Sequence, residues 1–257
     1  MNMITISIFV LGLVIGSFLN AFIYRMGKEG SVLKGRSYCP HCKYTLSWYD
    51  LIPLLSFILL KGSCRYCSKR ISIQYPVVEL ATGLLFLSVF FFQGGEIWTL
   101  PYGLFIAAVL IVIFVYDLKH YLIPDIVAYS GIAVSLLYLT ALSLFAEGIP
   151  LISGLIAAVI ASGFFLSLFL ISRGKWMGFG DVILGFLMGL VVGFPNILVA
   201  LLASFVVGAI VGLVLISLKK KTMKAEVPFG PFLILGTFLA WFWGEEILSF
   251  YMSFVVI

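Results

Sequence analysis

The sequence predicts an all-α membrane protein that crosses the bilayer about eight times and carries one small polar loop domain. Of its 257 residues, 63% are hydrophobic and only 11% are charged, with a mean hydropathy of +1.20. Soluble globular domains do not reach this composition. The long apolar runs are continuous rather than alternating, which favours helices over the strands of a barrel. All four cysteines fall in the one long polar stretch.

A spanning helix needs about 20 mainly apolar residues. Eight runs approach this length, and we expect helices over residues 3–24, 76–93, 100–116, 125–146, 151–172, 182–194, 197–218 and 230–252. The sixth run is short and is joined tightly to the seventh through Phe194-Pro195-Asn196.

The basic residues predict the orientation of these spans. Nine of the 16 lysines and arginines lie between Arg25 and Arg70. With eight spans and the N-terminus outside, all 16 fall on one side. Basic loops remain in the cytosol, so residues 25–75 are predicted to be cytosolic and the chain to lie in the cytoplasmic (inner) membrane. The bias also explains the net charge of +5, and we expect no nucleic-acid partner.

The start of the chain has the charge order of an uncleaved anchor. Residues 1–7 carry no basic side chain, whereas Arg25 and Lys28 follow the first apolar run. A secretory signal peptide has the opposite order. We therefore divide the chain into a first transmembrane helix (1–24), a cytosolic cysteine domain (25–75) and a seven-helix membrane core (76–257).

The cysteines form two matched pairs. Cys39 and Cys42 enclose Pro40-His41, and Cys64 and Cys67 follow after 21 intervening residues. Two C-x2-C pairs of this kind can close one tetrahedral site around Zn²⁺. Two disulfides, or four thiols without a role, are the alternatives, and a reducing cytosol disfavours the disulfides. Because all four ligands come from protein, the predicted zinc is structural and staples a small domain.

Two carboxylates lie at the borders of apolar runs. Asp117 ends the run 100–116, and Asp181 opens the run 182–194. In the eight-span topology both face the cytosolic side. Acidic residues at the edge of hydrocarbon are costly and usually functional. Two close carboxylates share one proton and can activate water against a peptide bond. Alternatively, each caps a helix or pairs with a lysine, or the pair belongs to a proton- or cation-coupled transporter.

The residues around Asp181 favour catalysis. Gly178 and Gly180 precede it in a Gly-x-Gly-Asp stretch, where the absence of side chains lets a substrate strand approach. With the second aspartate at another span's end, the chain resembles the type IV prepilin peptidases, which are GxGD aspartyl proteases. The similarity extends over nearly the whole chain, through Gly16 to Arg25, Cys39 to Glu79, Asp117 to Asp125, Gly178 to Asp181 and Pro228 to Pro231.

The resemblance implies a bifunctional enzyme. Such enzymes cut the basic leader of prepilins and pseudopilins after a glycine and then methylate the new N-terminus with S-adenosylmethionine. It implies that Asp117 and Asp181 are the catalytic pair, framed by Gly178 and Gly180, and that the four cysteines hold the metal. Glu79, Asn20 and Arg25 are candidates for contacts with the substrate or the methyl donor. The oligomeric state is left open.

Overall fold

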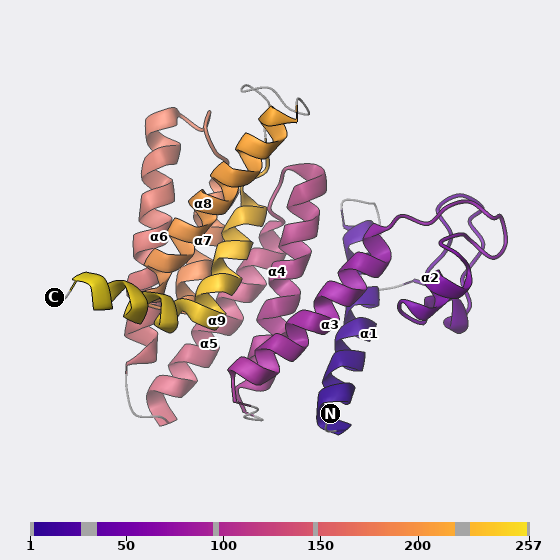
Figure 1. Cartoon of the computed structure of the whole chain (residues 1–257), viewed down its shortest axis with the longest axis horizontal. Helices are drawn as coiled ribbons and strands as arrows, with labels where there is room; N and C mark the ends of the chain where they lie inside the picture. Colours follow the sequence, from indigo (N-terminus) through magenta and orange to yellow (C-terminus); the bar gives the residue numbers. More distant parts are fainter. Residues whose placement is uncertain (1–2, 27–34, 95–97, 146–148, 219–226, 256–257) are drawn as a thin grey trace. The chain divides into compact units, whose positions relative to one another are not determined.

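The computed structural model describes residues 3–26, 35–94, 98–145, 149–218 and 227–255. Some of the basic residues on which the predicted orientation rests lie outside these ranges, in 27–34 and 219–226. Within them the chain forms helices and no β-strand, in the order α1 (Met3–Arg25), η1 (Trp48–Leu51), α2 (Leu55–Leu59), α3 (Gln74–Phe92), α4 (Leu100–His120), α5 (Asp125–Phe145), α6 (Pro150–Ser172), α7 (Phe179–Val192), α8 (Asn196–Ser217) and α9 (Gly230–Val255). Figure 1 labels these helices along the chain.

The all-helical membrane class is confirmed. Among the described residues, seven helices are long and apolar enough to cross a membrane, namely α1, α3, α4, α5, α6, α8 and α9. The predicted sixth span is the 14-residue α7. At 1.5 Å per residue it is about 21 Å long, shorter than the hydrocarbon layer of about 30 Å.

Two helix ends differ from the sequence expectation, and each difference concerns one of the two acids. The helix expected over 182–194 begins at Phe179, so Asp181 lies inside its first turn. The helix expected over 100–116 continues to His120, so Asp117 lies inside its last turns. Hydropathy misses both extensions because most of the added residues are charged, histidine or glycine, while the backbone hydrogen bonds continue.

The chain divides into two compact units, Met1–Val112 and Ile113–Ile257, with the boundary inside α4. In the first unit, α1 packs against α3. Glycines in α1 make the approach close: a Cβ atom on Gly12 would lie 2.7 Å from the Cα of Gly83. A Cβ atom on Gly16 would lie 2.8 Å from the Cα of Glu79. Small residues at such contacts are the usual means of packing helices in lipid.

In the second unit, α7 is the central helix. It contacts α5, α6, α8 and α9, and nine of its 14 residues are buried. Gly185 receives the ring of Phe165, and Gly189 lies directly against the backbone of Ala157 and Ala158 in α6. The core of this unit therefore surrounds the helix whose first turn carries Asp181.

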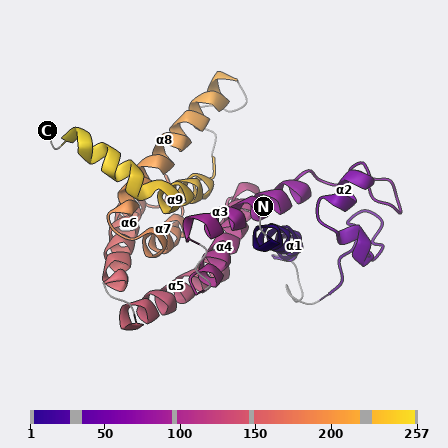
Figure 2. The same cartoon turned by 60° about the horizontal axis from the view of Figure 1, so that its bottom comes forward.

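The last helix, α9, is bent. Its backbone departs from helical geometry at Trp243, with φ −130° and ψ 15°. Figure 1 and Figure 2 both show the helix turning sharply along its length. The run expected over 230–252 is thus one helix through Val255 with two differently directed segments.

Candidate active site and metal centre

Asp117 is a buried carboxylate close to the C-terminal end of α4. The residue is 5% exposed. Its backbone carbonyl accepts a hydrogen bond from Tyr121 N–H at 2.9 Å, which closes the helix. Tyr121 has a φ of 55°, so the chain leaves α4 abruptly. The end of α4 therefore holds the acid inside the protein rather than in solvent.

Asp181 is the second buried carboxylate and lies in the first turn of α7. It is 8% exposed. Gly178 precedes the helix in an extended conformation, with φ −80° and ψ 160°. The backbone N–H of Gly178 is a hydrogen-bond donor to the Asp181 carboxylate. The acid is thus fixed by the turn that begins the helix.

Gly230, at the start of α9, completes the surroundings of Asp117. Its backbone N–H is a hydrogen-bond donor to the Asp117 carboxylate. A Cβ atom on Gly230 would lie 2.5 Å from Asp117 Oδ2, so a larger residue would displace the carboxylate from its observed position. Sequence reasoning placed Gly230 in a family-like stretch but assigned it no role. The one indication of a role in the sequence is that a glycine begins the predicted span 230–252.

Ile123 lies against two glycines, each of which is next to one of the acids. Its Cβ lies 3.0 Å from a Cβ position on Gly180, and its Cδ1 lies 3.6 Å from one on Gly230. One side chain therefore bridges the glycine before Asp181 and the glycine against Asp117. The carboxylates of Asp117 and Asp181 also interact electrostatically. Residues that are distant in the sequence thus meet at one buried, acidic place.

This arrangement brings together Asp117, Asp181 and Gly180 of the predicted site. Gly178 differs from Gly180, because a Cβ atom there would meet only the backbone N of Gly180, at 3.9 Å. A Cβ atom at position 180 would crowd Ile123, whereas there is space for one at position 178. Two close buried carboxylates cannot both ionise cheaply, so such a pair holds one proton and can act as acid and base together.

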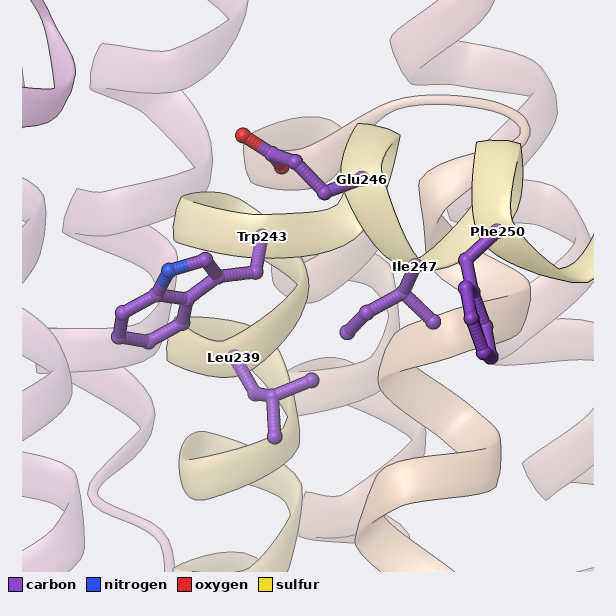
Figure 3. A pocket seen from close by; sticks show the side chains of 5 residues that line it. All are labelled: Leu239, Trp243, Glu246, Ile247 and Phe250. Atoms are coloured by element: carbon purple, nitrogen blue, oxygen red, sulfur yellow. The ribbon is translucent and has the colours of Figure 1, made fainter.

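An apolar concavity at the bend of α9 is separate from the two acids. Leu239, Trp243, Ile247 and Phe250 line it, and the carboxylate of Glu246 points away from their side chains (Figure 3). Leu239 follows Gly230 by nine residues, which is about 13 Å along the helix axis. The concavity is therefore distant from Asp117 along α9, and its apolar lining side chains cannot take part in acid–base chemistry there.

The four cysteines come together in the first unit. Each pair forms the same small turn. In the first, Lys43 N–H donates to Cys39 O at 2.9 Å and Cys39 N–H donates to Tyr44 O at 3.0 Å. In the second, Ser68 N–H donates to Cys64 O and Cys64 N–H donates to Lys69 O, both at 2.9 Å. Lys43 and Ser68 share a left-handed backbone. The chain thus presents two equivalent pairs of sulfurs.

The sulfur geometry fits a tetrahedral metal. All four Sγ atoms lie within 4.8 Å of one another, and the cysteines are free thiols. The Sγ atoms of Cys39 and Cys67 are 3.8 Å apart. Four sulfurs at the usual Zn–S distance of about 2.3 Å are separated by about 3.8 Å. The four cysteines are therefore able to bind a metal ion.

The thiols differ in acidity. Burial raises the pKa of Cys39, but backbone hydrogen bonds from Cys42 and His41 outweigh it and lower that pKa to about 7. A backbone hydrogen bond from Lys69 lowers the pKa of Cys67, yet burial and the neighbouring thiols outweigh it and raise that pKa to about 11. A cluster of this kind does not readily lose every proton unless a cation compensates the charge.

Asp50 joins the two halves of the cysteine domain. It accepts hydrogen bonds from Arg65 Nε at 2.8 Å, Tyr66 Oη at 3.1 Å and Ser47 N–H at 3.2 Å. Burial raises the pKa of Asp50, but these bonds outweigh it and leave that pKa below its ordinary value. The Tyr44 and Tyr66 rings also stack, with centroids 3.8 Å apart.

Glu79 lies buried in α3 and binds the loop domain. Its Oε2 accepts a hydrogen bond from Leu54 N–H at 2.8 Å. Leu54 has φ 59° and ψ −47°, and Leu55 N–H donates to Pro53 O at 2.6 Å. This is a γ-turn of the rare, strained form. Glu79 thus holds an unfavourable backbone in place at the start of α2.

Asn20 and Arg25 also join α1 to the loop domain and to α3. Asn20 is buried, and its amide donates to Tyr75 O at 3.1 Å and accepts from Gln74 Nε2 at 3.2 Å. Arg25 donates to Gly35 O at 3.0 Å. Each described contact fixes the structure at the ends of α1 and α3.

Comparison with known proteins identifies this combination of sites. The model of the bacterial peptidase A24 N-terminal domain matches residues 10–92, which include the cysteines. The model of the type IV leader peptidase family matches residues 104–213, which include Asp117 and Asp181. No solved structure matches the chain significantly. These matches define the class as membrane-embedded leader peptidases.

Curated relatives agree over almost the full length. The prepilin leader peptidase/N-methyltransferase of Bacillus subtilis is 33% identical, covering 96% of this chain and 97% of the relative. The proteins of the same name from Stutzerimonas stutzeri and Legionella pneumophila are 31% and 32% identical, each covering 92% of the relative and 95% and 94% of this chain, respectively. The chain belongs to the type IV leader peptidase family and is a multi-pass inner-membrane protein. Family membership gives no support to the transporter alternative.

Proposed function

We propose that this enzyme cleaves the leader peptides of prepilins and pseudopilins with Asp117 and Asp181 as its catalytic pair, and then methylates the new N-terminus. The observation that carries the first step is the meeting of two buried carboxylates, from α4 and α7, around Ile123 and Gly230. The names and full-length similarity of the relatives support both activities.

Hydrolysis needs one proton acceptor and one proton donor. The ionised carboxylate of the pair takes a proton from water as its oxygen attacks the scissile carbonyl carbon. The protonated carboxyl polarises that carbonyl, and the departing nitrogen receives a proton as the C–N bond breaks. One water is added across the peptide bond, and no metal or covalent intermediate is required. The open face of Gly178 is where an extended substrate strand would approach.

The proposed orientation places this chemistry at the cytosolic border. Asp117 is near the end of α4 and Asp181 is at the start of α7. With the N-terminus outside and residues 25–75 in the cytosol, both helix ends face inward. A substrate with an apolar helix and a basic leader has its cleavage point at the same height, because the leader stays with the cytosolic headgroups.

The cysteine domain is proposed to bind one structural Zn²⁺ through Cys39, Cys42, Cys64 and Cys67. The metal would supply a fixed fold rather than catalysis, because four protein ligands leave no open position. We assign residues 25–75 to the methylation activity and 76–257 to proteolysis. S-adenosylmethionine would supply the methyl group that is transferred to the new N-terminal amine.

We propose that three residues support methylation indirectly, by holding the cysteine domain in position: Glu79, Asn20 and Arg25. Their contacts hold the start of α2 and the two ends of the cysteine domain on α1 and α3. A direct contact with S-adenosylmethionine is the alternative role for Glu79.

Mass spectrometry of a mature pilin N-terminus tests both activities at once. Membranes containing the enzyme are incubated with a prepilin, with and without S-adenosylmethionine. We expect a shortened pilin in both reactions and an added methyl group, about 14 Da, only with the donor. An intact leader in both reactions would contradict the proposed protease, whereas a shortened but unmethylated pilin would contradict only the transferase.

Gly230→Ala is expected to lower the cleavage rate by about 100-fold. The added Cβ meets Asp117 Oδ2 at 2.5 Å, so the carboxylate must move, and a shift of about 1 Å can cost that much in rate. The control is Gly212→Ala in α8, where a Cβ atom meets nothing within 4 Å. Rates are measured with purified protein at equal folded concentration. Equal rates for both variants would show that Asp117 does not depend on Gly230.

A further inference from the structure

The cysteine domain carries exposed apolar side chains on its two short helices. Trp48, in η1, is 77% exposed. On α2, Ile58 and Leu59 are 68% and 70% exposed, and Leu55 is also exposed. Positions 55, 58 and 59 share one helix face because they are three and four residues apart. The two helices contact each other, so the apolar side chains form neighbouring surfaces.

The orientation of α2 is built into the fold. On the inner side, the ring of Phe57 rests against Gly62, where a Cβ atom would lie 3.0 Å from the ring. Gly62 has a φ of +69°, which favours glycine. At the start of α2, the strained Leu54 is bonded to Glu79 of α3. The helix is thus held with Leu55, Ile58 and Leu59 outward.

The domain that carries this face has a surplus of positive charge. Between residues 35 and 73 the only acid is Asp50, which is buried and paired with Arg65. The exposed basic residues in the same range are Arg36, Lys43, Lys61, Arg65, Lys69 and Arg70. Six positive charges and one negative charge give +5. A Zn²⁺ with four thiolates contributes −2, which leaves +3. An exposed apolar face with this surplus is complementary to anionic lipid headgroups.

The ends of the domain keep it near a membrane surface. It begins after α1 ends at Arg25 and returns to the bilayer where α3 begins at Gln74. Both helices are long and apolar enough to span, so the domain enters and leaves at one surface. Two hydrogen bonds also hold the domain close to these helices, from Asn20 to Tyr75 and from Leu54 to Glu79.

We propose that η1 and α2 lie in the headgroup region of the bilayer. Trp48, Leu55, Ile58 and Leu59 insert between the upper parts of the acyl chains, and exposed lysines and arginines of the same domain contact anionic headgroups. The cysteine domain is then a membrane-bound element and not a freely projecting cytosolic one (Figure 1 and Figure 2 place α2 on this domain). This inference is independent of the catalytic roles proposed above.

Fluorescence quenching of Trp48 tests the depth of this face. The full chain is placed in nanodiscs of phosphatidylcholine and phosphatidylglycerol, with bromines either at carbons 6 and 7 or at carbons 11 and 12 of the acyl chain. Subtracting the emission of Trp48→Phe isolates the Trp48 signal. We expect the shallow bromines to halve this signal or reduce it further, the deep bromines to reduce it less, and aqueous iodide to leave it nearly unchanged.

Two outcomes would overturn the proposal. A Trp48 signal that iodide quenches and bromines do not would place the face in water. A signal that neither reagent quenches would place it against protein, in another part of this chain or a second copy. The double variant Ile58→Ser with Leu59→Ser separates insertion from folding. We expect it to retain one zinc per chain while bromine quenching of Trp48 falls at least twofold; unchanged quenching would contradict insertion through α2.

Discussion

Replacing Asp117 or Asp181 with asparagine is expected to lower the rate of leader cleavage by at least about 10³-fold, which corresponds to about 4 kcal/mol of transition-state stabilisation. Asparagine has nearly the shape of aspartate, and at position 117 it preserves the packing against Gly230. It cannot take or give a proton, so the chemistry is lost while the fold is kept. The double variant should be no slower than either single variant, because the pair acts as a unit.

The measurement is single-turnover cleavage of a prepilin by purified enzyme at matched concentration. Asp125→Asn is the matched control, because Asp125 is also acidic and also lies at a helix start in the second unit, but is exposed. We expect this control to stay within a few-fold of the unmodified enzyme. A single variant at Asp117 or Asp181 that cleaves at the normal rate would remove that residue from the mechanism.

Replacing Cys39 or Cys64 with serine is expected to remove the metal and abolish methylation, with a loss of at least about 100-fold. Both residues are buried in the sulfur cluster, and structural zinc contributes about 10–16 kcal/mol to the folding of small zinc peptides. Without the metal, the two turns that carry the cysteines are joined only by weaker contacts, such as the hydrogen bonds of Asp50 and the stacking of Tyr44 on Tyr66. Leader cleavage should remain within about tenfold, because Asp117 and Asp181 lie in the second unit.

Zinc content per chain and the methylated fraction of cleaved pilin are the two readouts. His41→Ala is the control, because His41 lies between Cys39 and Cys42 but is exposed and is not among the clustered sulfur ligands. It should retain one zinc and its methylation activity. Full zinc binding by Cys39→Ser, or methylation without zinc, would contradict the structural role of the metal.

Local sequence was sufficient for much of this protein. Each predicted apolar run is a helix in the structure, because continuous hydrophobic residues in lipid must satisfy their backbone within the segment. The spacing of Cys39, Cys42, Cys64 and Cys67 predicted a common site, because two short C-x2-C turns need no long-range information to present paired sulfurs. The structure brings these four sulfurs together.

Helix ends were less accessible to sequence reasoning. Hydropathy ended one run before Asp117 and began another after Asp181, whereas both acids lie inside helices. Apolar content marks the part of a helix that lies in lipid, while hydrogen bonding decides where the helix stops. The bend of α9 at Trp243 was invisible for a similar reason, since the apolar run continues through it.

The sequence by itself determined the class of fold, the two acids and the four thiols, because composition, spacing and residue type are local properties. Only the tertiary structure decided that Gly230 adjoins Asp117, that Ile123 adjoins Gly180 and Gly230, and that Glu79 holds a strained turn at Leu54. These contacts join segments that are far apart along the chain. They depend on how the helices pack. Whether two side chains fit together across a helix contact depends on the volumes of both, so neither segment predicts it alone.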